Sequence, residues 1–166
     1  MRSMTSLAVD EFDEQPFRFT ATAKLDADPL AVFAELGDPS LWFPLMRRSV
    51  WKTGATSGVG AEREVHMRSF GVFRERMLAW DRGERVAFTM LATTSPLIDR
   101  MGEDWQLSRD GIYTRIDWIV AAKPTLIGRA ATLPLRGILR MMFIRACGNL
   151  QKRAGTFKRE RAKEVS

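Results

Sequence analysis

Apolar and polar residues alternate strictly over positions 17–25, and this period of two predicts a half-buried β-strand. Asp28-Pro29 follows the strand. An aspartate N-cap with proline at the first helical position predicts a short helix, here running to residue 36. Asp38-Pro39 repeats the signal, so we expect a second short helix over residues 40–43, which Pro44 prevents from extending.

A series of strands separated by short turns is predicted after these two helices. The expected strands cover residues 47–53, 61–68, 70–80, 84–91, 103–109 and 112–122. Asp110-Gly111, between the last two, is a strong hairpin signal. Residues 92–102 are less regular and include Pro96, so we expect a loop there. The spacing of the turns indicates an antiparallel meander.

The end of the chain carries an apolar stripe at spacings of three and four, which predicts one long amphipathic helix. The stripe consists of Leu135, Leu139, Met142, Ala146, Leu150, Ala154 and Phe157. Pro134 would disturb a continuous helix, so residues 125–133 are expected to form an irregular or helical approach. An antiparallel sheet has to cover its apolar face, and only this helix is long enough to do so. The predicted fold class is therefore α+β of the helix-grip type, a curved antiparallel sheet of about seven strands wrapped round a long C-terminal helix.

Four stretches, in this order, resemble the START-like superfamily, also called SRPBCC. Within it they are similar to the polyketide cyclase/dehydrase and lipid-transport group, whose fold is Bet v 1-like. The stretches are Asp28-Pro-Leu-Ala-Val-Phe33 through Asp38-Pro-Ser-Leu-Trp42, Gly58-Val-Gly-Ala-Glu-Arg63, Glu75-Arg-Met-Leu-Ala-Trp-Asp81 followed by Arg85-Val-Ala-Phe88, and Thr114-Arg-Ile-Asp-Trp118 followed by Leu126-Ile-Gly-Arg129. The likeness covers residues 17–157. It implies a cavity between sheet and helix that takes lipids, sterols, polyketides, quinones or aromatic compounds, with catalysis in only some members.

The length of 166 residues fits one domain, expected over residues 16–160. Residues 1–15 are acidic and are expected to form a mobile lead-in, and residues 161–166 a charged tail. The lead-in lacks the apolar core of a signal peptide, and the longest apolar runs are too short to span a bilayer, so we expect a cytoplasmic protein. The single cysteine, Cys147, excludes an intramolecular disulfide and multi-cysteine zinc sites. The oligomeric state is left open.

Positive charge is concentrated at the C-terminal end of the chain. The net charge is +6, yet the residues from Leu126 onward contain ten lysines or arginines and two acids. We interpret this as the solvated face of the long helix, with peripheral contact to an anionic membrane surface as the alternative. Aromatic and basic residues do not interleave there, which argues against nucleic acid as a partner.

Few residues offer catalytic chemistry. His66, the only histidine, shares a strand phase with Glu62, Glu64 and Arg68, which places it on the solvent face. Cys147 has no visible base to make a thiolate. Nucleophile-elbow, phosphate-loop and dinucleotide glycine patterns do not occur. No metal site and no cofactor are predicted.

The strand over residues 70–80 has two phases. Arg74, Arg76, Leu78 and Trp80 share one phase, and because the two arginines prefer water, the opposite phase, with Glu75, is placed inward. Arg63 is the expected partner of an inward Glu75. Two interpretations stay open: a buried structural ion pair, or a pair that orients a ligand, with Glu75 as a weak candidate for a base.

The expected wall of the cavity is otherwise apolar, and Thr114 is its one side chain expected to hydrogen-bond a ligand. The wall is predicted to consist of Trp42, Met67, Phe73, Glu75, Met77, Phe88, Met90, Trp105, Thr114, Ile116, Trp118, Met142 and Ala146. Binding or transport of a hydrophobic small molecule is the main hypothesis. The alternatives are an enzyme of the cyclase, aromatase or dehydratase type using Glu75, Arg63 and Thr114, and a lipid chaperone or ribosome-associated factor that acts through the basic helix.

Overall fold

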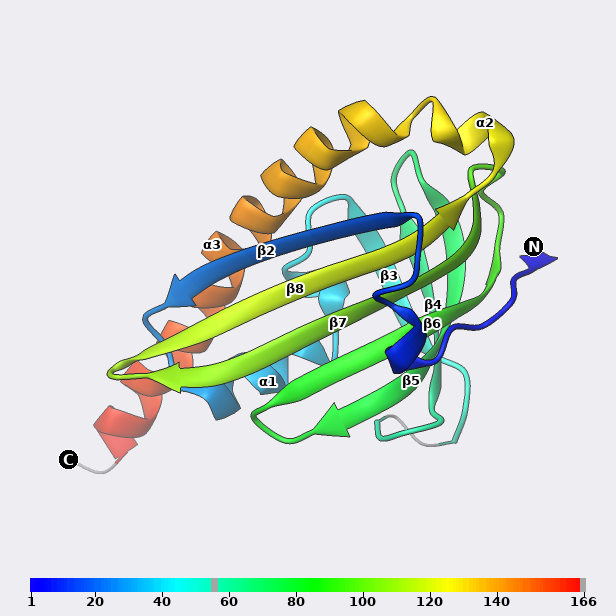
Figure 1. Cartoon of the computed structure of the whole chain (residues 1–166). Coiled ribbons are helices and arrows are strands. Elements are labelled where there is room, and N and C mark those ends of the chain that lie inside the picture. Colours follow the sequence, from blue (N-terminus) through cyan, green and yellow to red (C-terminus); the bar gives the residue numbers. More distant parts are fainter. Residues whose placement is uncertain (55–56, 165–166) are drawn as a thin grey trace.

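One curved antiparallel sheet and one long helix dominate the computed structural model of the chain (Figure 1). It describes residues 1–54 and 57–164, with side chains given through residue 155. The strands are β1 (Arg2–Ser3), β2 (Phe17–Leu25), β3 (Met46–Trp51), β4 (Glu62–Met67), β5 (Gly71–Asp81), β6 (Arg85–Thr93), β7 (Ile98–Asp110) and β8 (Tyr113–Pro124). The helices are η1 (Val9–Glu11), α1 (Pro29–Leu36), η2 (Pro39–Leu41), α2 (Leu126–Arg129) and α3 (Thr132–Glu164). The predicted α+β helix-grip class is confirmed.

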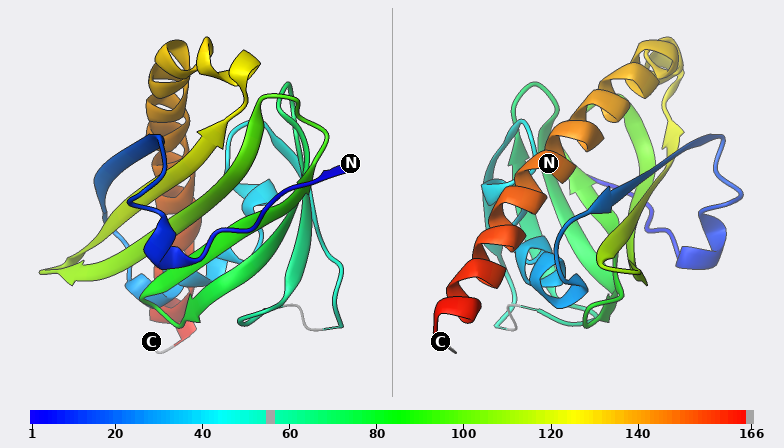
Figure 2. Two further views of the ribbon diagram at one scale, coloured as in Figure 1. Left: turned by 45° about the vertical axis from the view of Figure 1, so that its right-hand side comes forward. Right: turned by 90° about the vertical axis from the view of Figure 1, so that its left-hand side faces the viewer.

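The sheet order is β2-β8-β7-β6-β5-β4-β3, so each strand from β3 to β8 pairs with its neighbour in the chain and β2 closes against β8. Figure 2 shows α3 crossing one face of this sheet, with α1 beside its C-terminal half. The apolar stripe of α3 faces the sheet, and Leu139, Met142, Ala146 and Leu150 are buried there. Phe157, the last residue of the predicted stripe, lies outside the residues whose side chains are described. The tail expected over residues 161–166 begins as a continuation of α3.

Aspartate caps followed by proline mark where the two short helices begin. Asp28 caps α1 by accepting from the amide of Leu30 at 2.9 Å, and Pro29 is the first residue of the helix, as predicted. The second short helix is a 3-10 turn that starts at Pro39, where Asp38 accepts from the amide of Ser40. Asn149 of α3 donates to the carbonyl oxygen of Trp42 at 2.9 Å and so ties the long helix to this turn.

Two predictions about prolines were wrong. The loop expected over residues 92–102 is a turn of four residues, because β6 continues to Thr93 and β7 begins at Ile98. Pro96 lies in that turn, where no ladder hydrogen bond is lost. Pro134 does not disturb the long helix, because α3 begins at Thr132 and the proline falls in the first turn, whose amides have no partner within the helix.

The segment before β2, which was expected to form a mobile lead-in, packs on the sheet in the structure. β1 pairs with β6, and Leu7 and Phe12 are buried against Ala121 on the face of the sheet away from α3. Phe12 lies directly over Gly102 of β7, where even a methyl group would meet its ring. The lead-in thus covers part of the outer face of the sheet.

A β-bulge changes the direction of side chains near the end of β5. The register shifts between Met77 and Ala79, so Leu78 points outward but Trp80 turns to the inner side, where its ring contacts Phe33 and Trp51. The strict alternation predicted for this strand therefore holds only as far as Leu78. No helix in the described part of the chain is long and apolar enough to cross a bilayer.

Candidate functional site

A cavity of about 300 Å³ lies between the inner face of the sheet and the N-terminal half of α3. Apolar side chains form nearly all of its wall, contributed by the sheet, by η2 and by the α2–α3 segment. Nine of the thirteen predicted wall residues line it: Trp42, Met67, Phe73, Glu75, Phe88, Met90, Trp105, Trp118 and Met142.

The other four predicted residues, Met77, Thr114, Ile116 and Ala146, are fully buried but do not line the cavity. They lie within the core on the inner face of the same elements. Thr114 donates its hydroxyl to the carbonyl oxygen of Ala27 at 2.6 Å, just before α1. Its hydroxyl therefore bonds within the fold, and its side chain is not among those that line the cavity.

Arg63 and Glu75 form the expected buried ion pair in the wall of the cavity. The two residues face each other on β4 and β5, and both Nε and Nη2 of Arg63 donate to Oε2 of Glu75, at 2.9 and 2.7 Å. Nη1 donates to the carbonyl oxygens of Leu36 and Gly37 at the end of α1. Burial raises the pKa of Glu75, and the charge and hydrogen bonds of Arg63 oppose that shift.

Aromatic rings enclose the guanidinium as well. Its carbon lies 5.3 Å from the ring centre of Trp51 and 5.5 Å from that of Phe88. Cation–π contacts of this kind stabilise a cation that has lost water. The charge of Arg63 is therefore matched by one carboxylate and covered by two rings.

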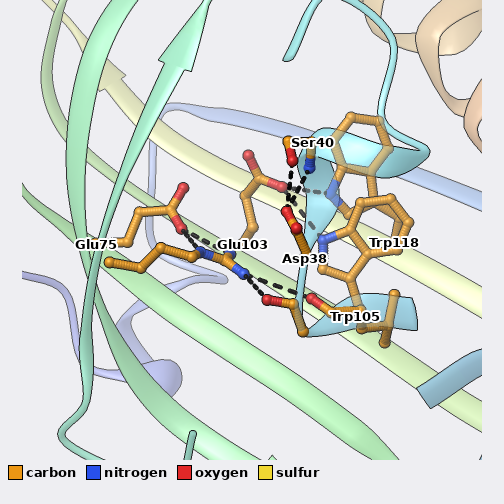
Figure 3. A network of polar contacts seen from close by, with 9 residues as sticks. Asp38, Ser40, Glu75, Glu103, Trp105 and Trp118 are labelled. Carbon is orange, nitrogen blue, oxygen red and sulfur yellow. Dashed lines mark hydrogen bonds and ion pairs between the residues drawn. The ribbon is translucent and has the colours of Figure 1, made fainter. Parts of the chain in front are cut away.

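Glu103 is the second carboxylate of the cavity, and the sequence reasoning did not single it out. Its Oε2 accepts the indole N–H of Trp118 at 2.8 Å and that of Trp105 at 3.3 Å, and the two rings stack with centroids 4.9 Å apart (Figure 3). Burial raises the pKa of Glu103 to about 7, and the nearby charge of Glu75 acts in the same direction. A signal was present, since Glu103 shares the inward strand phase of Trp105 and Leu107.

The sequence of residues 16–155 matches the family model described as polyketide cyclase/dehydrase and lipid transport. The chain belongs to this family. No curated protein matched the sequence.

Solved structures show the same fold at low sequence identity. The Zhui aromatase/cyclase from Streptomyces sp. R1128 is 14% identical with a TM-score of 0.68, over 84% of this chain and 93% of that one. XoxI from Bacillus cereus is 14% identical with a TM-score of 0.65, over 85% and 97% of the two chains. Ara h 8.0201 is 14% identical with a TM-score of 0.63, over 82% and 98%. At this identity the likeness establishes the Bet v 1-like fold alone.

In this member of the polyketide cyclase/dehydrase and lipid-transport family, the ionisable groups of the cavity are Arg63, Glu75 and Glu103, which lie together. They can meet the polar end of a ligand whose body lies against the apolar wall. Glu103, with a pKa of about 7, can also give or take a proton near neutral pH.

The two other residues considered for catalysis lie elsewhere. His66 is on the outer face, as predicted, with its side chain 35% exposed and Nε2 2.9 Å from Oε1 of Glu64. Cys147 is buried on α3, and desolvation raises the pKa of its thiol to about 12. A thiol with that pKa is not a nucleophile at neutral pH.

Proposed function

We propose that this protein binds and carries a small hydrophobic molecule that bears one polar group. The supporting observation is the cavity itself, an apolar space of about 300 Å³ whose ionisable groups are gathered in one cluster. A plain core of this size would be filled by side chains, because protein interiors pack with few voids larger than a water molecule.

Acid–base catalysis of the cyclase or dehydratase type is the second candidate function, and one observation favours it. Glu103 lines the cavity, and its pKa of about 7 suits proton transfer at neutral pH. In that case Glu103, rather than Glu75, is the proton-transfer group, because Glu75 is held by two hydrogen bonds from Arg63.

The proposal includes a second element: the protein takes up and releases its ligand at the surface of an anionic membrane. Leu126, Ile127 and Leu133 are 72–84% exposed on α2 and at the start of α3. Arginines 129, 136 and 140 lie in the same segment, and residues 118–159 include no acid. Apolar side chains among cations suit the interface of an anionic bilayer. Gly128, Ala131 and Pro134 of this segment also line the cavity.

The first test is extraction of natively purified protein with organic solvent, followed by mass spectrometry. If the protein carries a ligand, the extract should contain an apolar compound in a stoichiometric amount relative to the protein. Ala122→Phe, which points a ring into the cavity, should abolish it, whereas Lys123→Phe, which puts the same ring on the exposed neighbouring position, should not. Equal retention by both variants would show that the compound sits elsewhere. Conversion of the recovered compound on incubation would favour the enzyme.

The membrane contact is tested separately, by sedimentation with vesicles that contain anionic phospholipid. Leu133→Asp should abolish most of the binding. Ile112→Asp, which changes a 71% exposed residue in the distant β7–β8 turn, should leave binding intact. Equal loss in the two variants, or binding that persists at high salt, would contradict an electrostatically assisted contact through α2 and α3.

A further inference from the structure

Most of the N–H donors around Arg63, Glu75 and Glu103 are already engaged within the protein. The indole N–H groups of Trp105 and Trp118 donate to Glu103, and that of Trp42 donates to the carbonyl oxygen of Glu35 at 2.7 Å. All three nitrogens of Arg63 donate to protein oxygens. A ligand group that only accepts hydrogen bonds, such as a carboxylate, therefore meets few free donors.

The hydrogen-bond acceptors of this cluster, by contrast, are only partly engaged within the protein. Each of the two carboxylates uses only Oε2 in the protein, and Oε1 of Glu75 and of Glu103 receives no hydrogen bond from the residues that the structure describes. Figure 3 shows each carboxylate with one oxygen outside the network of dashed lines. Both residues line the cavity, so these oxygens are the acceptors that a ligand in the cavity would meet. An acceptor that faces an apolar cavity is stabilised by a ligand that donates a hydrogen bond to it.

The balance of charge also favours a ligand that donates hydrogen bonds over one that only accepts them. One guanidinium faces two carboxylates, and Arg63 is already paired with Glu75. An ionised Glu103 therefore leaves this end of the cavity with an excess negative charge in an apolar surrounding. A cationic group would offset that charge, and an anionic group would add a repulsion that the low local dielectric strengthens.

We propose that the cavity selects hydrophobic ligands whose polar end donates hydrogen bonds, an amine most strongly and an alcohol next, and that it rejects carboxylates such as free fatty acids. This selectivity rests on the proposed function, since it requires that the cavity be a binding site. It narrows the ligand class through three side chains and makes no use of the membrane-facing segment.

The test is displacement of a neutral naphthylamine dye from the intact protein by decylamine, decanol and decanoic acid, which each have ten carbons in an unbranched chain and differ in the head group. At about pH 8, above the Glu103 pKa of about 7, the amine is a cation and the acid an anion. We expect decylamine and decanol to displace the dye, with decanoate weaker than decylamine by about tenfold or more. Titrations without protein correct for dye in ligand aggregates.

Glu103→Gln separates selectivity from folding. The amide oxygen can still accept from both indoles, but the second acceptor becomes a donor and the charge is lost. In this variant decylamine should bind more weakly and decanoate more tightly. The ratio of their affinities, decylamine over decanoate, should therefore fall by about tenfold. Met142→Leu, a change of similar volume elsewhere in the wall, should leave the order of the three ligands unchanged.

The outcomes are distinguishable. If the dye binds but decanoate displaces it as well as decylamine does, the selectivity is wrong while the binding function stands. If neither the dye nor any of the three compounds binds, the proposed function fails and the selectivity with it. A ratio that Glu103→Gln leaves unchanged in a folded variant overturns the role assigned to that carboxylate.

Discussion

Arg63 and Glu75 face each other on β4 and β5, and one position along, Glu62 and Arg76 face each other on the opposite side of the same two strands. The chemistry of the two pairs is alike, with N–O distances of 2.7 and 2.8 Å. Their surroundings differ: the side chains of the inner pair are 2–3% exposed, and those of the outer pair 22–48%. The exposed pair Glu62–Arg76 can therefore serve as a control for the buried pair Arg63–Glu75.

The two pairs should respond very differently to loss of the arginine. Arg63→Met leaves Glu75 buried without its partner, and we expect a loss of about 3–5 kcal/mol in the free energy of unfolding. Arg76→Met should cost at most about 1 kcal/mol, because water screens the outer pair. Urea unfolding followed by circular dichroism measures both. Similar losses for the two variants would mean that the buried pair is far better solvated than its burial indicates.

Replacing both members of the inner pair tests the origin of that loss. Arg63→Met combined with Glu75→Leu should recover most of the stability, because the cost of the single change comes from a carboxylate left alone in an apolar place. A double variant as unstable as Arg63→Met would instead assign the loss to the guanidinium contacts with Trp51, Phe88 and the end of α1. Ligand binding should change as well, since the variant removes two of the three ionisable groups of the cavity and leaves Glu103.

Glu103 should make the stability of the protein depend on pH. Its folded-state pKa is about 7, above the ordinary value of 4.5, so between these values the folded state holds a proton that the unfolded state releases. The free energy of unfolding should therefore fall as the pH rises from about 5 to about 7.5, by on the order of 1–3 kcal/mol. The raised pKa of Glu75 acts with the same sign.

Glu103→Gln isolates this contribution, since the amide does not titrate in this range. Urea midpoints of the variant should vary less between about pH 5.5 and about pH 8 than those of the unchanged protein, with the two proteins closest at the acidic end. An identical pH dependence for the two proteins would rule out a raised pKa at Glu103.

Much of the site was predictable from strand phase. The preference of Arg74 and Arg76 for water placed Glu75 inward, and the phase of Arg63 on the neighbouring strand supplied its partner; the structure shows both. The same argument from strand phase also predicts that Glu103 points inward. The predicted strand begins at Glu103, whereas β7 begins five residues earlier, at Ile98, so Glu103 stands at the edge of the predicted strand rather than within it.

The extent of the cavity was not predictable in the same way. Alternation along a strand separates the inner from the outer face, but it does not say where side chains on α1 and α3 fill the inner space. Met77 and Ile116 are therefore core, whereas Phe88 and Trp118 on neighbouring strands line the cavity. The bulge after Met77 likewise depends on strand pairing rather than on any local signal, and Trp80 beyond it lies on the inner side.

Thr114 offers a test of the boundary between core and cavity. Thr114→Val removes the hydroxyl that donates to Ala27, leaves that buried carbonyl without this donor, and should cost about 1–3 kcal/mol of unfolding free energy. Displacement of the naphthylamine dye should be unchanged, because the side chain does not line the cavity. A change in ligand affinity without a change in stability would place the hydroxyl in the binding site after all.

Gly102 tests whether the N-terminal segment belongs to the folded domain. A methyl group at this position would lie 2.4 Å from the ring of Phe12 and 3.1 Å from the carbonyl oxygen of Phe88, so Gly102→Ala should displace the ring. We expect a loss of about 1–3 kcal/mol and faster amide hydrogen exchange confined to residues 1–15. Gly137→Ala, in open space on α3, should instead stabilise the protein by about 0.5–1 kcal/mol. If residues 1–15 keep their protection in Gly102→Ala, the contact with Phe12 is not what holds this segment on the sheet.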